Sequence, residues 1–87
     1  MKVKEFSQAC ENNKTPILNA LKKYFLDVSK VLEIGSGSGQ HAMYFADQLN
    51  WLTWQPTETK ERLWVLQSNC RLSSRNNLCS PLVLNIF

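Results

Sequence analysis

The chain is poor in the residues that build metal sites and disulfide frameworks. Its 87 residues include a single histidine, His41, and three cysteines with no C-x-x-C pair. A zinc site of two cysteines and two histidines is therefore impossible within one chain, and a Cys₃His site would need all three scattered thiols. We expect no metal site, and we expect free reduced thiols, as is usual in the cytoplasm.

Long apolar runs and strong charge are also lacking. No apolar stretch approaches the roughly 20 residues that span a bilayer. The first five residues lack the apolar core of a signal peptide. The formal net charge is only +3, and no basic run is interleaved with aromatic side chains. The sequence therefore indicates neither a membrane nor a nucleic-acid partner, and the expected location is cytoplasmic.

Glycine is scarce too, but all three glycines of the chain lie within residues 35–39. They follow the apolar segment Val31–Ile34 and precede Gln40 and His41, which predicts a strand, a tight turn and the start of a helix. Glycine permits positive φ and leaves no Cβ in the way of a ligand. The amides of the following helix point to the same place. Parallel α/β sheets present nucleotide-like ligands at such turns.

The spacing of the glycines narrows the choice of ligand. A dinucleotide fingerprint reads G-x-G-x-x-G and a P-loop ends in Gly-Lys-Ser/Thr, whereas this loop reads G-x-G-x-G. Glu33 lies two residues before Gly35. A carboxylate there repels a pyrophosphate and suits an ammonium group. S-adenosylmethionine (SAM), which carries an ammonium and a sulfonium but no phosphate, fits both features.

The segment from Val31 to His41 resembles motif I of the class I SAM-dependent methyltransferases. A closer resemblance, to a small uncharacterised methyltransferase-like family, covers most of the chain. It is carried by four segments in order: Asn13-Lys14-Thr15-Pro16-Ile17-Leu18, Gly37-Ser38-Gly39-Gln40-His41-Ala42, Tyr44-Phe45-Ala46 and Trp54-Gln55-Pro56-Thr57-Glu58. Asn12 stands where that family tends to have arginine, which argues against an anion contact at this position.

The resemblance implies roles for individual residues. Glu33 would face the methionine end of SAM, and Glu58, 19 residues beyond Gly39, would accept hydrogen bonds from the ribose hydroxyls. Asn85, which stands where an acid is frequent in methyltransferases, would contact the adenine. The full set of candidate SAM-binding residues is Asn13, Glu33, Gly35, Ser36, Gly37, Gly39, His41, Glu58 and Asn85. The segment around Asn13 is expected to act as a lid. The sequence identifies no catalytic residue. It does not identify the methyl acceptor either, which is expected to be a small molecule or a protein.

Residue periodicity and turn chemistry predict the elements. We expect an N-terminal helical segment over 1–29 and a βαβαβ unit over 30–87, with parallel strands in the order 3-2-1. Thr15 is the predicted N-cap of the first helix, with Pro16 at its first position. Pro56 is predicted to end the second strand, and Thr57 or Thr59 to cap the third helix. The predicted strands are 30–34, 51–55 and 81–87, and the predicted helices are 16–26, 40–49 and 60–71.

The resemblance implies a Rossmann-like α/β domain of seven strands, of which this sequence supplies the first three. We therefore expect the N-terminal half of a methyltransferase domain, truncated before strand 4 and inactive alone. Its first strand would expose an unpaired edge, so we expect either self-association into homo-oligomers through that edge or dependence on a longer parent polypeptide. Two alternatives stay open: a non-catalytic SAM-binding or self-associating fragment, and a Rossmann fragment that binds NAD.

Overall fold

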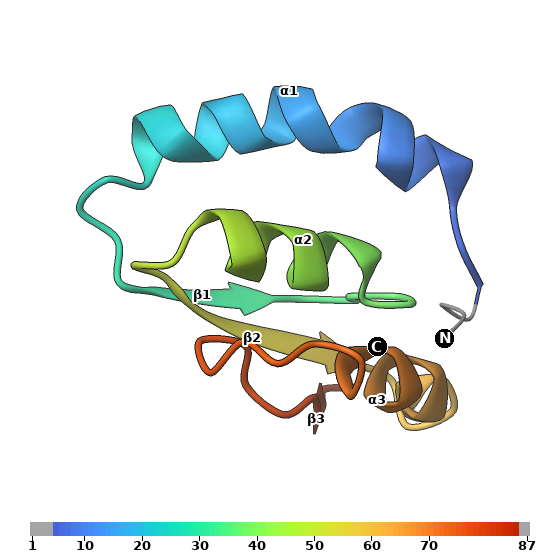
Figure 1. Ribbon diagram of the computed structural model, residues 1–87. Coiled ribbons are helices and arrows are strands. Elements are labelled where there is room, and N and C mark those ends of the chain that lie inside the picture. The colour runs from blue at the N-terminus through green and yellow to red at the C-terminus, as the bar shows by residue number, and fades with distance from the viewer. Residues whose placement is uncertain (1–4, 86–87) are drawn as a thin grey trace.

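The computed structural model describes residues 5–85 as an α/β unit with an open, parallel sheet (Figure 1). The strand order is β1-β2-β3, and both neighbouring pairs are parallel. This confirms the predicted class and strand order. Along the chain the elements are α1 (Gln8–Tyr24), β1 (Lys30–Glu33), α2 (Gln40–Gln48), β2 (Thr53–Glu58), α3 (Leu63–Cys70) and β3 (Leu82–Val83).

The register of the sheet brings the loop after β1 to the end of β2. Lys30 pairs with Thr53 and Glu33 with Pro56, so β1 ends two residues before β2 does. Residues 34–39 therefore continue alongside the last residues of β2. β3 pairs only with this same end of β2, through Thr57 and Glu58. The carboxyl ends of all three strands consequently lie at one edge of the sheet.

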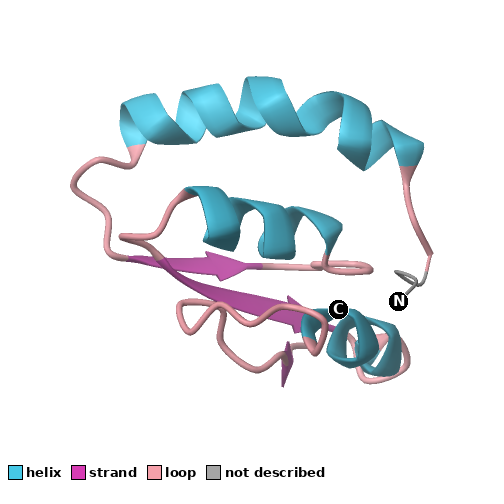
Figure 2. Cartoon of the chain, in the orientation of Figure 1, coloured by secondary structure: helices cyan, strands magenta, loops and turns pink. Residues whose placement is uncertain are grey.

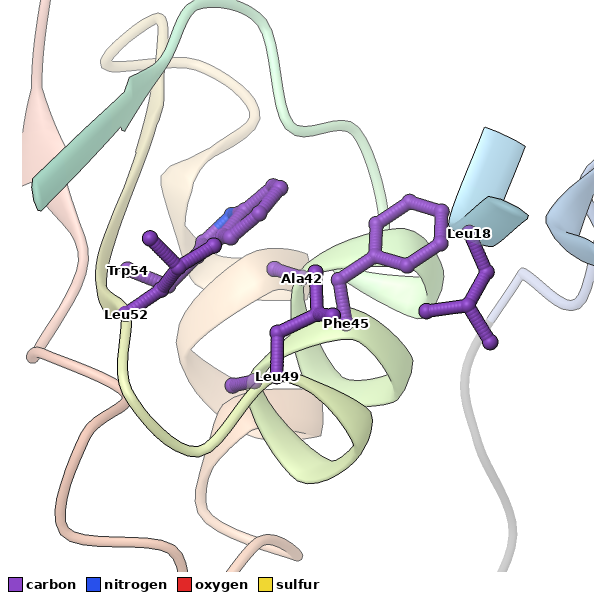
Figure 3. Close-up of a cluster of buried hydrophobic side chains, with 7 residues drawn as sticks. Leu18, Ala42, Phe45, Leu49, Leu52 and Trp54 are labelled. Carbon is purple, nitrogen blue, oxygen red and sulfur yellow. The ribbon is translucent and has the colours of Figure 1, made fainter. Parts of the chain in front are cut away.

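The hydrophobic core lies between the sheet and two helices on the same side of it, with α2 between α1 and the strands (Figure 2). Ala42, Phe45 and Ala46 form the buried stripe of α2. The ring of Phe45 packs against Trp54 of β2, with ring centroids 5.6 Å apart. Leu18 of α1 reaches toward Phe45 from the opposite side (Figure 3). The helical spacing of these apolar residues explains why they meet on one face.

The first helix spans Gln8–Tyr24 instead of 16–26, which corrects both the predicted N-cap at Thr15 and the predicted end. α1 begins at Gln8, where the Ser7 side chain caps the helix by accepting a hydrogen bond from the Cys10 amide at 3.2 Å. Pro16 lies inside the helix and is exposed. An interior proline removes one helical hydrogen bond, but the helix continues because the apolar stripe containing Leu18 still packs on α2.

The second strand continues through Pro56, which was predicted to end it. In a strand, alternate residues direct their backbone polar groups to the same side. The Trp54 amide and carbonyl bond to Asn77 and Cys79, on the β3 side. The nitrogen of Pro56 therefore also faces that side, where strand pairing begins only at Leu82. The missing N–H leaves the ladder with β1 intact, so β2 spans Thr53–Glu58 instead of 51–55.

The remaining differences concern element ends. α3 begins at Leu63 with Arg62 at its N-cap and no side-chain cap, so neither Thr57 nor Thr59 caps it. Thr57 is a buried residue of β2 instead. β1 and α2 each end one residue earlier than predicted. β3 comprises only Leu82–Val83, and the predicted strand residues 86 and 87 lie outside the described part of the chain.

One edge of the sheet and several apolar side chains are uncovered. β1 pairs with β2 on one side and has no strand on its other side within residues 5–85. Leu32, within β1, and Ile34, just beyond its end, are 60% and 56% exposed. Within the same residues, none of the helices is both apolar enough and long enough to cross a bilayer.

Candidate ligand-binding site

The loop between β1 and α2 adopts the conformation that its glycines permit. Gly35, Gly37 and Gly39 have φ angles of +66°, +60° and +83°, which L side chains rarely adopt. A Cβ placed on Gly35 or Gly37 meets no atom within 4 Å, whereas one on Gly39 would lie 2.8 Å from Cδ1 of Leu66. The first two glycines are therefore open to a ligand, and the third allows α3 to pack against the loop.

Glu58 ends β2 with its carboxylate bonded to the glycine loop. Its Oε2 accepts a hydrogen bond from the Gly37 amide at 2.8 Å, and its Oε1 accepts one from the Thr59 amide at 2.9 Å. An ionised carboxylate has about four acceptor positions, so each oxygen can still accept one more hydrogen bond. Glu58 is half-buried, and the two backbone amides hold both of its carboxylate oxygens in place.

Thr57 joins the loop to the sheet. Its carbonyl accepts a hydrogen bond from the Ser36 amide at 2.7 Å, and its own amide donates to Oγ of Ser36 at 3.0 Å. Its hydroxyl donates to the Glu33 carbonyl at 2.6 Å. Thr57 is 2% exposed, so these bonds are shielded from water. Ser36, a predicted contact residue, thus holds the loop in place through its side chain.

Glu33 lies on the helix-covered side of β1, where its Oε1 accepts a hydrogen bond from Nε1 of Trp54 at 3.1 Å. It lines a cavity of about 320 Å³ together with the glycine loop. Oε2 of Glu33 has no hydrogen-bond partner within residues 5–85. One carboxylate oxygen is therefore available to a cationic group in the cavity.

The N-terminal segment forms the opposite wall of this cavity. The side-chain amide of Gln40 makes two hydrogen bonds with the backbone of Ser7, at 2.8 and 3.0 Å. Nε2 of His41 donates to the Cys10 carbonyl at 3.2 Å. Both residues belong to the first turn of α2, so the start of α2 is tied to the start of α1. His41 is committed to this contact and also packs on Phe45, with ring centroids 5.2 Å apart.

An ion pair completes the wall. The guanidinium of Arg62, which precedes α3, donates through Nη1 to Oε2 of Glu5 at 3.2 Å and through Nη2 to Oε1 of the same residue. This bidentate contact lowers the pKa of Glu5 and raises the pKa of Arg62. Besides the glycine loop, the cavity is lined by Glu5, Ser7, Cys10, Glu33, Gln40, His41 and Arg62.

Most of the residues predicted from the sequence meet at this place. Glu33, Gly35, Ser36, Gly37 and His41 line the cavity. Gly39 and Glu58 adjoin the same loop.

Two predicted contact residues lie elsewhere. Asn13 is exposed on α1, and Asn85 is exposed after β3. Neither lines the cavity. The segment that does border the glycine loop is the chain before and at the start of α1, ahead of Asn13.

The sequence interpretation missed several residues that build the site. Arg62 carried no recognisable motif, and its partner Glu5 is 57 positions away. Asn69, in α3, is 1% exposed and donates to the Ser38 carbonyl at 2.7 Å, which fixes the second half of the loop. Asn69 follows two other polar residues, Gln67 and Ser68, so the sequence pattern did not single it out. No group of three or more histidine, cysteine or acidic side chains among residues 5–85 is arranged to hold a metal ion.

Comparison with known families assigns the chain to one of them. The model of one family, described as "Protein of unknown function (DUF938)", matches residues 4–87. The chain belongs to the DUF938 family. No solved structure matches it. The matched residues include β1, the glycine loop, Glu58 and Arg62.

Proposed function

We propose that this DUF938 chain binds SAM over its glycine loop and is the donor-binding part of a Rossmann-like methyltransferase. The observation that carries the proposal is the position of Glu58, whose carboxylate is bonded to the Gly37 amide. This places two preoriented acceptors beside a loop that is open at Gly35 and Gly37. A ribose diol and a ligand body that approaches the backbone closely fit this arrangement.

The charges of the site support SAM over a dinucleotide. A pyrophosphate needs the amides of a glycine loop as donors, but Glu58 already accepts the Gly37 N–H. Glu33 adds a carboxylate to the cavity beside this loop, whereas the charge of Glu5 is paired with that of Arg62. A doubly negative ligand would be repelled here, whereas the ammonium and sulfonium of SAM would be attracted. The NAD-binding alternative is therefore disfavoured.

Four residues of the site would contribute to holding the donor. Glu58 would accept hydrogen bonds from the two ribose hydroxyls, and the free oxygen of Glu33 would accept one from the ammonium group. Gly35 and Gly37 would let the ligand approach the backbone. SAM supplies an activated methyl group, and transfer to a nucleophile depends mainly on how donor and acceptor are positioned. The methyl acceptor is a small molecule or a protein.

The decisive variant is Glu58→Ala, examined by isothermal titration with SAM and with S-adenosylhomocysteine. We expect binding to weaken by about 1.5–3 kcal/mol, the range for hydrogen bonds to a charged group. Glu61→Ala is the matched control, because Glu61 is an exposed acid three residues along the chain. Titration with NAD should give no heat of binding. Unchanged affinity for SAM in Glu58→Ala would exclude the ribose contact, and tighter binding of NAD than of SAM would reject the proposed function.

A further inference from the structure

The cavity beside the glycine loop holds three charged side chains that are not equivalent. Glu33 and Glu5 are acids, and Arg62 is the basic residue that lines the cavity. Arg62 makes a two-pronged contact with the carboxylate of Glu5. Arginine is suited to planar, bidentate recognition of a carboxylate. The chain therefore already contains a carboxylate-binding position at this cavity, and Glu5 fills it.

The contact between Glu5 and Arg62 is placed where it can be exchanged. Both side chains are nearly half exposed, at 44% and 47%. Exposed ion pairs contribute little to stability. Glu5 also has a φ angle of +55°, the one positive value at a non-glycine residue within 5–85. This conformation is disfavoured for a residue that has a Cβ.

The rest of the cavity shows which ligand group would replace Glu5. Oε2 of Glu33 lacks a partner within the described residues and can bind an ammonium group. Arg62, once separated from Glu5, offers two donors to a carboxylate. An ammonium and a carboxylate on one ligand are the two charges of an α-amino acid. The methionine end of SAM has both.

We propose that Arg62 binds the α-carboxylate of the methyl donor, and that Glu5 occupies this position in the ligand-free chain as an internal substitute. The inference rests on the proposed function, because it assigns one end of the same ligand. It makes Glu5 a competitor for the donor: the N-terminal segment closes on Arg62 without a ligand and is displaced from Arg62 when a carboxylate binds.

Two ligands that differ only in the carboxylate test the proposal. S-adenosylhomocysteine has the group, and its decarboxylated analogue retains the amine, the ribose and the adenine without it. Isothermal titration of the whole chain with both ligands gives an affinity ratio for each variant. We expect Arg62→Gln to weaken S-adenosylhomocysteine binding about tenfold or more, equivalent to about 1.4 kcal/mol, and to leave the analogue unaffected. Glu5→Gln should strengthen binding of S-adenosylhomocysteine alone.

A second ion pair of the same chemistry supplies the controls. Arg75 and Asp47 pair on the surface with similar exposure, 55% and 40%, and neither lines this cavity. Arg75→Gln and Asp47→Asn should change neither affinity. Circular dichroism and thermal melting verify that each variant is folded, and Arg62→Lys should recover part of the lost affinity because it keeps the charge but not the fork.

The outcomes separate this proposal from the proposed function. Equal gains for both ligands in Glu5→Gln would mean that Glu5 only obstructs entry, which overturns the carboxylate assignment. Equal losses, or no loss, in a folded Arg62→Gln would also overturn it while SAM binding stands. Failure of the unaltered chain and of Glu5→Gln to bind either ligand would reject both proposals together.

Discussion

At the residue scale, the three glycines share one backbone conformation but differ in their surroundings. Alanine at any of them would destabilise the fold by roughly 1–2 kcal/mol, because a residue with a Cβ disfavours a positive φ. At Gly39 the new Cβ would also lie 2.8 Å from Leu66 and 3.3 Å from Sγ of Cys70. Gly35 has open space at the same position. The same substitution therefore tests packing at one site and ligand access at the other.

We expect Gly39→Ala to lower the free energy of unfolding more than Gly35→Ala does, by about 1–3 kcal/mol, the usual cost of overpacking a core. Urea denaturation of the two variants measures the difference. Equal stabilities for the two alanine variants would show that α3 moves to accommodate the extra methyl group.

Gly37→Val, in contrast, should abolish SAM binding, since its branched side chain fills the open space of the loop.

Cys70 provides a second prediction at this scale. Burial, assisted by the negative charge of Glu33, raises the pKa of the Cys70 thiol from 9.0 to about 11. Because the thiolate is the reactive form, this higher pKa leaves about 100-fold less of it at neutral pH. Iodoacetamide labelling followed by mass spectrometry should modify Cys10 and Cys79, which are half-buried, well before Cys70. Labelling of Cys70 first, in the folded chain, would contradict this assignment.

At the scale of the elements, Asn77 holds the end of α2 in place. Its side-chain amide donates to the carbonyls of Ala46, Leu49 and Leu52, at 2.8, 3.4 and 2.9 Å. The last carbonyls of a helix have no partners within the helix itself. Asn77 thus caps α2 from a loop 25 to 31 residues further along the chain, and its backbone carbonyl also accepts the Trp54 amide.

We expect Asn77→Ala to lower the free energy of unfolding by about 1–3 kcal/mol, the cost of leaving buried polar groups without partners. Asn76→Ala is the control, because the neighbouring asparagine is exposed. Chemical denaturation followed by circular dichroism compares the two variants. If both have the same stability, water replaces the Asn77 amide at these carbonyls without cost.

At the scale of the whole molecule, one edge of the sheet is uncovered within residues 5–85. An unpaired strand edge beside exposed apolar side chains is a template for another strand. β1 has such an edge within residues 5–85, flanked by Leu32 and Ile34. We propose that copies of this chain associate through β1. Burial of these side chains would also supplement the small core, since a whole domain usually has only about 5–15 kcal/mol of stability.

Leu32→Lys should weaken this association, because a charge on the edge strand opposes pairing. Leu26→Lys is the control: Leu26 is 69% exposed but lies in the loop that follows α1. Sedimentation velocity over a range of concentrations measures the effect. A chain that stays monomeric at high concentration, or equal association of the two variants, would exclude the β1 edge as the interface.

The sequence alone was sufficient to predict what local chemistry determines. Three glycines between an apolar strand and a helix predict the loop, and hydrophobic periodicity predicts α2 and its buried stripe. The parallel order follows from the short strand–helix–strand unit. Prediction was weakest where two local signals compete. Pro16 has the chemistry of a helix start, but the Ser7 cap and the packing of Leu18 extend α1 through it.

Only the tertiary structure decided how distant residues share the site. Glu5 meets Arg62 across 57 positions, and Glu58 meets Gly37 across 21. No periodicity or turn chemistry encodes such pairs, because they arise when strand register and helix packing bring separate segments together. Pro56 illustrates the same limit: its local preference is to end a strand, and the direction of its nitrogen within the assembled sheet makes it acceptable in β2. Local sterics and periodicity thus determined the elements, and long-range packing determined the charges around the cavity.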